Sequence, residues 1–287
     1  MIPSSFDYVR AGSIEEAIHL MHESNGEGKF LAGGHSLLPL MKFRLTNPGV
    51  LIDISQITEL RGVRKEGNRL VVGALTTHRA LYQDALVQAH IPVLGEAART
   101  IGDLQVRNKG TVGGNLAHAD SAADLPGVAL ALEAIVEVHG EDGKEAMEVE
   151  GFFLGPLVTA LSETSVLTSV SFLIPPPHTR SVYLKYAHPA SGYAVVGVCA
   201  IAGVDEGGRI DFVRIGINGA ADIAYRAASV EQALLGEQPT EETIRQASLL
   251  AAEDGEIGHD LFASESYRRH LCQVYTERAL RQILLET

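Results

Sequence analysis

The start of the chain combines one helical pattern with two strand-length apolar runs. Four apolar residues recur at helical spacing on one face: Ile14, Ala17, Ile18 and Met21. The segment from Ser13 to Glu16 has the form of a capping box, which marks the beginning of this helix. Residues 29–32 and 50–54 have the length of strands, and residues 37–43 between them indicate a short helix. These elements predict a βαβ-like opening unit.

The middle of the chain shows strand and helix patterns in irregular order. Residues 70–73 and 134–138 read as strands. Helical spacing is found over residues 77–87, 93–101 and 122–132. Because the elements do not alternate regularly, this part is predicted to be mixed α and β rather than a parallel α/β sheet.

Three consecutive prolines at residues 175–177 mark the clearest domain boundary, because prolines neither continue a sheet nor enter a helix interior. One strand is expected before the prolines, at residues 166–174, and three after them, at 182–187, 193–204 and 210–217. Residues 205–208 are expected to form the hairpin connection between the last two strands. Three helices are expected to follow, at 230–235, 240–252 and 264–285. We predict an α+β protein with a two-part first domain at 1–176 (subdomains at about 1–56 and 57–176). A second domain of antiparallel strands and helices is predicted at 177–287.

Composition removes several classes of protein. The chain has 23 Lys plus Arg against 36 Asp plus Glu, a net charge of −13, so no nucleic-acid partner is expected. Its two cysteines, Cys199 and Cys272, are fewer than the roughly four thiolates of an iron–sulfur cluster, and we predict both as small core residues. We identify no signal peptide, no transmembrane segment and no metal site, so a reducing cytoplasm is the expected compartment.

Two glycine-rich segments are candidates for phosphate binding. They are Ala32-Gly33-Gly34-His35-Ser36 and Thr111-Val112-Gly113-Gly114-Asn115. The first lies between a predicted strand and a predicted helix, where backbone amides meet a phosphate at a helix start. Neither segment has the dinucleotide fingerprint or the P-loop pattern. Each one alone is also compatible with an ordinary tight turn.

Both segments and their flanks closely resemble one family. The stretches FLAGGHSLLPLMK (30–42) and GTVGGN (110–115), followed by Asp120 and Asp124, are similar to the FAD-binding medium subunit of aerobic carbon-monoxide dehydrogenase. That subunit belongs to the molybdenum hydroxylase family, which includes xanthine dehydrogenase. Three shorter stretches resemble the same subunit: residues 1–8, 52–54 and 218–220. The resemblance runs over essentially the whole chain.

The resemblance implies a role for each matching residue. Both glycine-rich segments, at 32–36 and 111–115, would hold the FAD pyrophosphate. Asp124 would bond the adenosine ribose, a suitable task for a carboxylate facing a diol. Lys185 matches a lysine near the flavin ring, where a cation favours the anionic reduced flavin, and Tyr193 matches an aromatic residue beside the isoalloxazine. Ser121 replaces a proline that many relatives have in the segment before Asp124.

Simpler interpretations remain for single residues. Asp124 could cap the helix that follows it. Lys185 could be a solvated strand residue and Tyr193 a half-buried strand aromatic. We expect His35 to contribute shape and a ring hydrogen bond rather than catalysis, and His118 to be a loop residue.

The function implied by the resemblance is electron transfer within a molybdenum-containing dehydrogenase. In such complexes a large molybdenum subunit oxidises the substrate and a small [2Fe–2S] subunit relays electrons to FAD on the medium subunit. The external acceptor would be a quinone, NAD or another carrier. A dimer of heterotrimers is expected, in the cytoplasm or bound through the complex to the inner face of the membrane. Carbon monoxide is the favoured substrate, and an N-heterocycle or an aldehyde is the alternative.

Two functions of other classes are also considered. A serine hydrolase could use Ser36, but the nucleophile-elbow pattern fails at Leu38, where a glycine is needed. A flavin-free assembly scaffold is the other, and the two intact glycine-rich segments argue against it.

Overall fold

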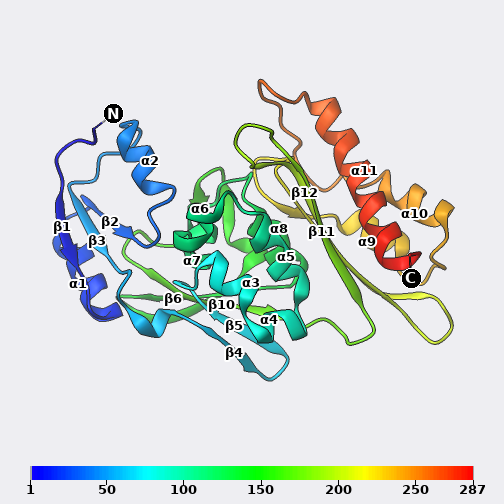
Figure 1. The fold of residues 1–287 in the computed structure, drawn as a ribbon, viewed down its shortest axis with the longest axis horizontal. Helices are drawn as coiled ribbons and strands as arrows, with labels where there is room; N and C mark the ends of the chain where they lie inside the picture. The colour runs from blue at the N-terminus through cyan, green and yellow to red at the C-terminus, as the bar shows by residue number, and fades with distance from the viewer. Residues whose placement is uncertain (1, 287) are drawn as a thin grey trace.

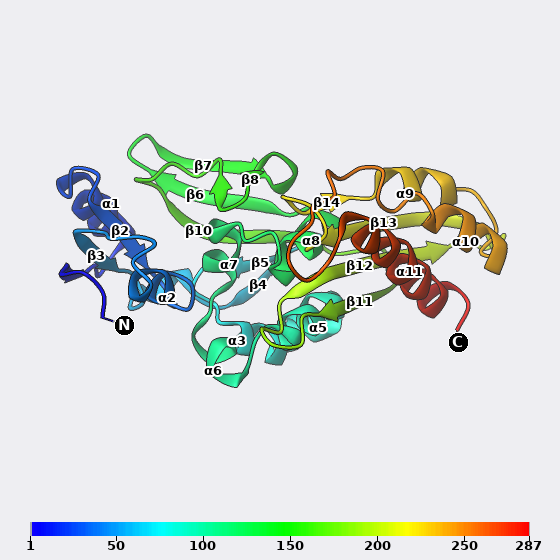
Figure 2. The same cartoon turned by 90° about the horizontal axis from the view of Figure 1, so that it is seen from above.

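The computed structural model describes residues 2–286 as three units in a row (Figure 1). The N-terminal unit lies at one end, a larger middle unit follows, and the C-terminal unit with the longest helix lies at the other end (Figures 1 and 2). Each unit has its own sheet, and three clusters of buried apolar residues form the cores. Among the described residues, no helix is both long and apolar enough to cross a membrane.

The N-terminal unit is a small parallel sheet with two helices. The strands are β1 (Asp7–Arg10), β2 (Gly28–Leu31) and β3 (Val50–Asp53), in the order β1-β3-β2, and the helices are α1 (Ile14–Glu23) and α2 (Leu37–Lys42). The predicted start of α1 is confirmed, because the Ser13 hydroxyl accepts a hydrogen bond from the Glu16 N–H at 3.1 Å. Strand β2, helix α2 and strand β3 form the predicted βαβ unit.

The middle unit places helices around an antiparallel sheet of order β4-β5-β10-β6-β7. Its strands are β4 (Val63–Glu66), β5 (Arg69–Gly73), β6 (Ile135–Gly140), β7 (Gly143–Glu148), β10 (Val166–Leu173) and the small pair β8 (Phe153–Gly155) and β9 (Val158–Thr159). Its helices are α3 (His78–Gln83), α4 (Ala85–His90), α5 (Pro92–Thr100), α6 (Leu104–Lys109), α7 (Val112–His118) and α8 (Asp124–Ala131), with 3₁₀ helices at Thr58–Leu60 and Val149–Gly151.

The prediction of one helix over residues 77–87 is wrong, because Asp84 divides it. Asp84 has extended backbone angles, φ −71° and ψ 131°, which end α3. Its carboxylate then accepts hydrogen bonds from the N–H groups of Leu86 at 2.9 Å and Val87 at 3.3 Å, so it caps α4. A capping residue inside a helical pattern therefore outweighs the periodicity.

The C-terminal unit is an antiparallel sheet, and its own helices cover the face opposite to the one that packs against the middle unit (Figure 1). The strands, in spatial order, are β11 (Arg180–Ala187), β12 (Ala194–Val204), β13 (Ile210–Asn218) and β14 (Tyr225–Arg226). The helices are α9 (Ala228–Leu234), α10 (Glu241–Ser248) and α11 (Glu265–Leu284). Cys199 on β12 and Cys272 on α11 are buried and free, as predicted, and burial raises the pKa of the Cys272 thiol to about 11.

Helix α8 joins the middle unit to the C-terminal sheet. Every residue of α8 is buried, and the helix packs against β12 and β13. The contact is made backbone to backbone, because a Cβ atom added at Gly216 would lie 1.9 Å from the carbonyl oxygen of Gly127. Glycine at position 216 permits this close approach, and a Cβ atom added at Gly127 would lie 2.8 Å from Asn218 Oδ1.

The predicted α+β class is confirmed, whereas several peripheral elements were not predicted. Strand β7 has an exposed, mostly polar sequence, so it lacks the apolar alternation that identifies a strand. Strands β1, β4, β8, β9 and β14 and helices α6 and α7 were also missed. These are short elements, and their positions depend on packing against the rest of the chain.

Candidate functional site

The first glycine-rich segment forms a turn between β2 and α2. Gly34 has φ +71°, a left-handed conformation that favours glycine. At Gly33 a Cβ atom would lie 2.1 Å from the carbonyl oxygen of Lys109, so this position also excludes a side chain. No hydrogen bond among the described residues uses the backbone N–H of Gly34, His35 or Ser36. Three consecutive donors are therefore free to bind an anion.

The second segment is the beginning of helix α7 rather than a loop. Thr111 is its N-cap, and the Thr111 hydroxyl accepts a hydrogen bond from the Gly114 N–H at 3.1 Å. The N–H groups of Val112 and Gly113 donate to the carbonyl oxygens of Thr76 and Ala74, at 3.0 and 2.8 Å. These N–H groups already donate hydrogen bonds within the protein. The segment can therefore contact a ligand through its side chains and through the glycine backbone, but not through these three donors.

Asn115 in α7 has an unused polar atom. Its Oδ1 is buried and has no hydrogen-bond partner among the described residues. Asn115 also lines the largest cavity near the two segments. Since buried polar atoms are nearly always paired, a donor from a bound ligand is the natural partner for this oxygen.

One cavity of about 700 Å³ brings together most of the predicted site residues. It is lined by Ala32, Gly33, Gly34, His35, Ser36, Thr111, Gly113, Gly114, Asn115, Asp124 and Tyr193. Val112 is fully buried in the core of the middle unit, so its side chain does not reach the cavity. Lys185 is likewise absent from the lining.

Asp124 connects the cavity to a buried polar cluster. Its Oδ2 lies 3.0 Å from the Lys185 ammonium, and its Oδ1 accepts a hydrogen bond from the Tyr183 hydroxyl at 2.6 Å. Burial raises the pKa of the Asp124 carboxyl, and the Lys185 charge opposes this rise. The Lys185 ammonium also donates to the carbonyl oxygen of Thr100 at 2.9 Å. Lys185 therefore contacts the site through Asp124.

This cluster overturns two of the simpler interpretations. Asp124 does not cap α8, because the N-cap is Ala123 and no side-chain capping bond is made. Lys185 is not solvated, because its side chain is only 7% exposed. Tyr183 was not predicted as a site residue, although its two-residue spacing from Lys185 on one strand places both side chains on the same face of the sheet.

The hairpin between β11 and β12 holds Tyr193 at the cavity. Gly192 has φ +73°, and His188 Nδ1 accepts hydrogen bonds from the N–H groups of Ala190 and Ser191, each at 3.2 Å. Tyr193 precedes β12 and is 46% exposed, so it is not a strand residue. Burial, followed by the charges of Asp120 and Asp124, raises the pKa of the Tyr193 phenol.

Three further predictions concern single side chains. His35 Nδ1 lies 3.0 Å from the Gly33 carbonyl oxygen, a ring hydrogen bond of the kind expected. His118 is the last residue of α7 and lines the cavity, so its prediction as a loop residue is wrong. No hydrogen bond of the described residues joins the Ser36 hydroxyl to a histidine, so the pairing that would activate a nucleophile is missing.

Hydrogen bonds hold the segment before Asp124, which contains Ser121. Ala119 adopts a left-handed conformation, φ +51°, at the end of α7. The Asp120 carboxylate accepts a hydrogen bond from the Ala122 N–H at 2.9 Å, and the Ser121 carbonyl accepts one from the Gly219 N–H at 2.7 Å. These two hydrogen bonds therefore fix the conformation of the segment.

The arrangement suits a dinucleotide with a diphosphate. Free amides at residues 34–36 provide an anion cradle, Asn115 and Asp124 provide polar contacts, and the cavity volume lies within the usual range for cofactor sites. A diphosphate held mainly by backbone needs few Lys or Arg side chains, which is consistent with an acidic chain.

Comparison with known proteins identifies the same class. The family model described as FAD binding domain in molybdopterin dehydrogenase matches residues 4–176, and that described as CO dehydrogenase flavoprotein C-terminal domain matches residues 181–283. The chain therefore belongs to the FAD-binding medium subunits of the molybdenum hydroxylase family, of the carbon monoxide dehydrogenase type. It is an oxidoreductase subunit whose cofactor is FAD.

Individual relatives cover nearly the whole chain. The carbon monoxide dehydrogenase medium chain of Hydrogenophaga pseudoflava is 37% identical, over 98% of this chain and 97% of that protein. The glyceraldehyde dehydrogenase medium chain of Sulfolobus acidocaldarius is 32% identical, over 99% and 100%. Among solved structures, carbon monoxide dehydrogenase from H. pseudoflava matches with a TM-score of 0.94 and 38% identity, covering 98% of each chain. Quinoline 2-oxidoreductase from Pseudomonas putida 86 matches with 0.93 and 31%, covering 99% and 98%.

Proposed function

We propose that this chain carries electrons, through its FAD, from a [2Fe–2S] partner subunit to an external acceptor. The observation that supports this most directly is the single cavity that collects both glycine-rich segments, Asp124 and Tyr193. FAD suits this task because it exchanges electrons singly with a cluster and in pairs with a two-electron carrier.

The residues of the chain would hold and orient the cofactor. The free N–H groups of residues 34–36 would bind the diphosphate, and Asn115 Oδ1 would accept a hydrogen bond from a hydroxyl or N–H group of the cofactor. Each carboxylate oxygen of Asp124 accepts one bond from the protein and keeps a lone pair for a ribose hydroxyl. Lys185 would keep Asp124 ionised and add positive charge behind it, and Tyr193 would cover the ring.

Two partner subunits follow from this role. The described part of the chain has no cluster of three or more metal-ligating side chains, so the [2Fe–2S] clusters would come from a small subunit. A large subunit would hold the molybdenum cofactor and oxidise the substrate. We propose a dimer of these heterotrimers, in the cytoplasm or at the inner face of the membrane, with a quinone, NAD or another carrier as acceptor.

The proposed domain division follows the three units of the fold. Residues 1–176 would form the FAD-binding domain, with subdomains at about 1–56 and 57–176, and residues 177–287 the C-terminal domain. The first two units supply the glycine-rich segments, and the third supplies Lys185 and Tyr193.

The proposed substrate of the complex is carbon monoxide. Support comes from the 37% identity to a carbon monoxide dehydrogenase medium chain. The nicotine 6-hydroxylase medium subunit of Paenarthrobacter nicotinovorans is 33% identical, and it and the glyceraldehyde dehydrogenase relative keep an N-heterocycle and an aldehyde as alternatives.

The test is to purify the chain with its partners and record the flavin absorbance. Bleaching on addition of carbon monoxide, without external reductant, would support both the electron-transfer role and the substrate. Bleaching with nicotine or glyceraldehyde but not carbon monoxide would support the role and reject the substrate. An assembled, active complex without flavin would contradict the proposal and favour the scaffold. Labelling of Ser36 by a fluorophosphonate would favour the hydrolase.

A further inference from the structure

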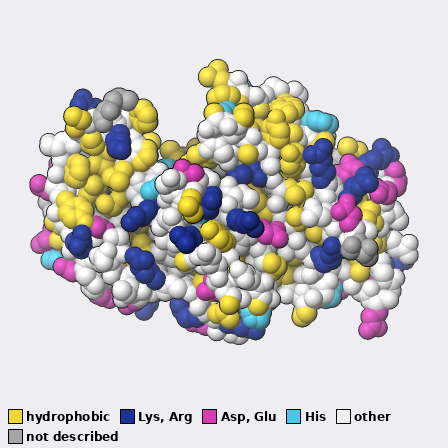
Figure 3. Space-filling view, viewed as in Figure 1, with side chains coloured by type: hydrophobic (Ala, Val, Ile, Leu, Met, Phe, Trp, Pro, Cys, Tyr) yellow, Lys and Arg dark blue, Asp and Glu magenta, His cyan; other side chains and the backbone are white. Residues whose placement is uncertain are grey.

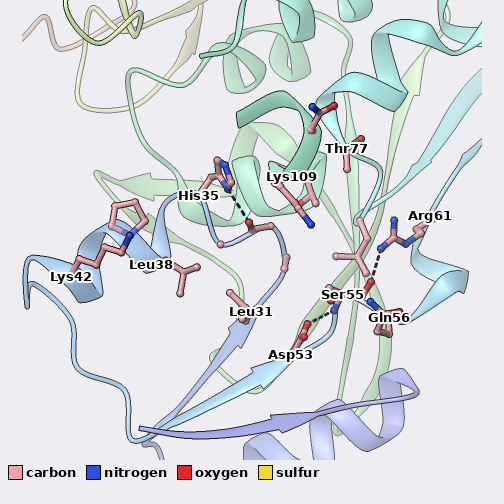
Figure 4. A pocket seen from close by; sticks show the side chains of 17 residues that line it. Leu31, His35, Leu38, Lys42, Asp53, Ser55, Gln56, Arg61, Thr77 and Lys109 are labelled. Carbon is pink, nitrogen blue, oxygen red and sulfur yellow. Dashed lines mark hydrogen bonds between the residues drawn. The ribbon is translucent and has the colours of Figure 1, made fainter. Parts of the chain in front are cut away.

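A second cavity lies against the first glycine-rich segment. It has a volume of about 580 Å³ and shares six lining residues with the larger cavity: Ala32, Gly33, Gly34, His35, Leu75 and Thr111. Figure 4 shows the residues that line this second cavity, and its other lining residues are not part of the lining of the larger cavity. The glycine-rich turn is therefore a wall common to two cavities, of which only the larger one contains Asn115, Asp124 and Tyr193.

Three cations surround this second cavity, which we call the cationic cavity. Lys42 comes from the end of α2, Arg61 from the connection before β4, and Lys109 from the end of α6. All three are exposed, and none is in a salt bridge among the described residues. Figure 4 shows the Lys109 side chain extending from its helix into the space beside the turn.

The single carboxylate in the lining does not neutralise these cations. Asp53 is 6% exposed, and its carboxylate accepts hydrogen bonds from the Tyr8 hydroxyl and the Ser55 N–H. Its Oδ2 lies 3.6 Å from the Arg10 guanidinium. Asp53 therefore has partners of its own, and the cavity keeps an excess of positive charge in a chain whose net charge is −13. Figure 3 shows Lys and Arg side chains gathered on the face between the N-terminal and middle units.

The rest of the lining is half apolar and half hydrogen-bonding. Four apolar side chains belong to the lining: Leu31, Leu38, Pro39 and Leu75. Amide and hydroxyl groups are contributed by Ser55, Gln56, Thr77 and Asn108, and Figure 4 shows Ser55, Gln56 and Thr77 across the cavity from Leu31 and Leu38. The Arg61 guanidinium is fixed there by a 2.5 Å hydrogen bond to the Ser55 carbonyl oxygen. An apolar wall beside clustered cations matches a molecule that carries both a flat ring and phosphate groups.

We propose that the cationic cavity binds a nucleoside phosphate, distinct from the FAD of the larger cavity. The phosphates would contact Lys42, Arg61 and Lys109, and the base would lie against Leu31 and Leu38. The volume of about 580 Å³ is sufficient for one mononucleotide. Because the two cavities share the turn at residues 33–35, an occupant here would contact the other side of the cradle that holds the FAD diphosphate.

The experiment titrates ADP into the full-length, FAD-loaded chain at low salt, and the heat of binding is measured by isothermal titration calorimetry. The flavin absorbance is recorded throughout, so that any release of FAD is detected. We expect saturable binding without flavin release. We also expect ADP to bind at least tenfold more tightly than adenosine or inorganic pyrophosphate, because only ADP engages both halves of the lining.

Variants locate the site. The double substitution Lys42→Met with Lys109→Met is expected to weaken ADP binding at least tenfold while leaving the FAD content and melting temperature unchanged. The control is Lys144→Met, which removes an exposed cation from β7, away from this lining, and is expected to change ADP binding less than twofold.

Several results would overturn the proposal. No saturable binding of ADP to the FAD-loaded chain would reject it, as would equal affinities for the wild type and the double variant. ADP binding that occurs only as flavin is released would show that the nucleotide enters the FAD site instead. Pyrophosphate binding as tight as that of ADP would reject the nucleoside part. None of these results depends on electron transfer, so they are independent of the proposed function.

Discussion

The two glycine-rich segments have similar sequences but use their backbones in opposite ways. The turn at residues 32–36 leaves three consecutive N–H groups without acceptors among the described residues. The segment at residues 111–115 begins a helix, and its first amides bond to Ala74, Thr76 and the Thr111 hydroxyl. One segment therefore provides donors for a ligand, whereas the other provides a rigid surface with two polar side chains. A pair of glycines does not by itself distinguish the two uses.

The largest effect is expected from Gly33→Val in the first segment. The new Cβ atom would lie 2.1 Å from the Lys109 carbonyl oxygen, so the turn must move and its free amides move with it. We expect FAD binding to weaken at least 100-fold, measured as flavin retained on gel filtration. Gly151→Val is the control, since no atom lies within 4 Å of an added Cβ there. Full flavin retention by Gly33→Val would show that the turn is not the cradle.

The next effect concerns Lys185→Met, which removes the partner of Asp124 beside the cavity. Leaving a buried carboxylate unpaired is expected to cost about 3 kcal/mol of unfolding free energy at neutral pH. The pKa of Asp124, already raised by burial, would rise further. A raised pKa in the folded state lowers stability as pH increases. The deficit should therefore be smaller at pH 5 than at pH 8.

The measurement for Lys185→Met is urea unfolding of both proteins at each pH. Adding Asp124→Asn removes the titrating group, so the double variant should lose the extra pH dependence. A deficit that is equal at pH 5 and pH 8 would mean that Asp124 is not the group responsible.

A smaller effect is expected at the cap of the second segment. Thr111→Val removes the hydroxyl that accepts from the Gly114 N–H, and lost N-caps cost about 1 kcal/mol. Thr111→Ser keeps the hydroxyl and should remain close to the wild type in thermal unfolding. Equal destabilisation by both substitutions would show that the methyl packing, and not the cap, supports α7.

The smallest effect is expected from Asn115→Ala. Its Oδ1 has no partner in the part of the chain that the structure describes, so removing it should leave the stability of the FAD-free chain unchanged. The affinity for FAD should fall about fivefold to tenfold, the cost of roughly one hydrogen bond. Loss of stability without loss of FAD affinity would reverse this assignment.

The sequence predicts which residues line the cavity more successfully than it predicts which of their side chains pair with one another. The glycine-rich segments, Asp124 and Tyr193 are local features that resemble a known family, and they line one cavity. The pairing of Asp124 with Lys185 joins residues 61 positions apart, so it depends on how α8 packs against the C-terminal sheet. No local pattern contains that information.

The beginning of α7 was missed for a different reason. Gly113 and Gly114 lower the helix propensity of the segment, and tertiary contacts of its N–H groups with Thr76 and Ala74 compensate for this. A threonine followed closely by two glycines is typical of a turn, so the sequence did not indicate the cap. Packing therefore decided a structure that propensity alone did not.

The close contact between Gly127 and Gly216 argues against producing the two parts of the chain as separate fragments. Two family models divide the chain near residue 180, which suggests that each part could be produced alone. A fragment beginning after that point would expose the face of β12 and β13 that α8 covers, and such apolar faces promote aggregation. The two parts match separate family models, but they share a buried interface through α8.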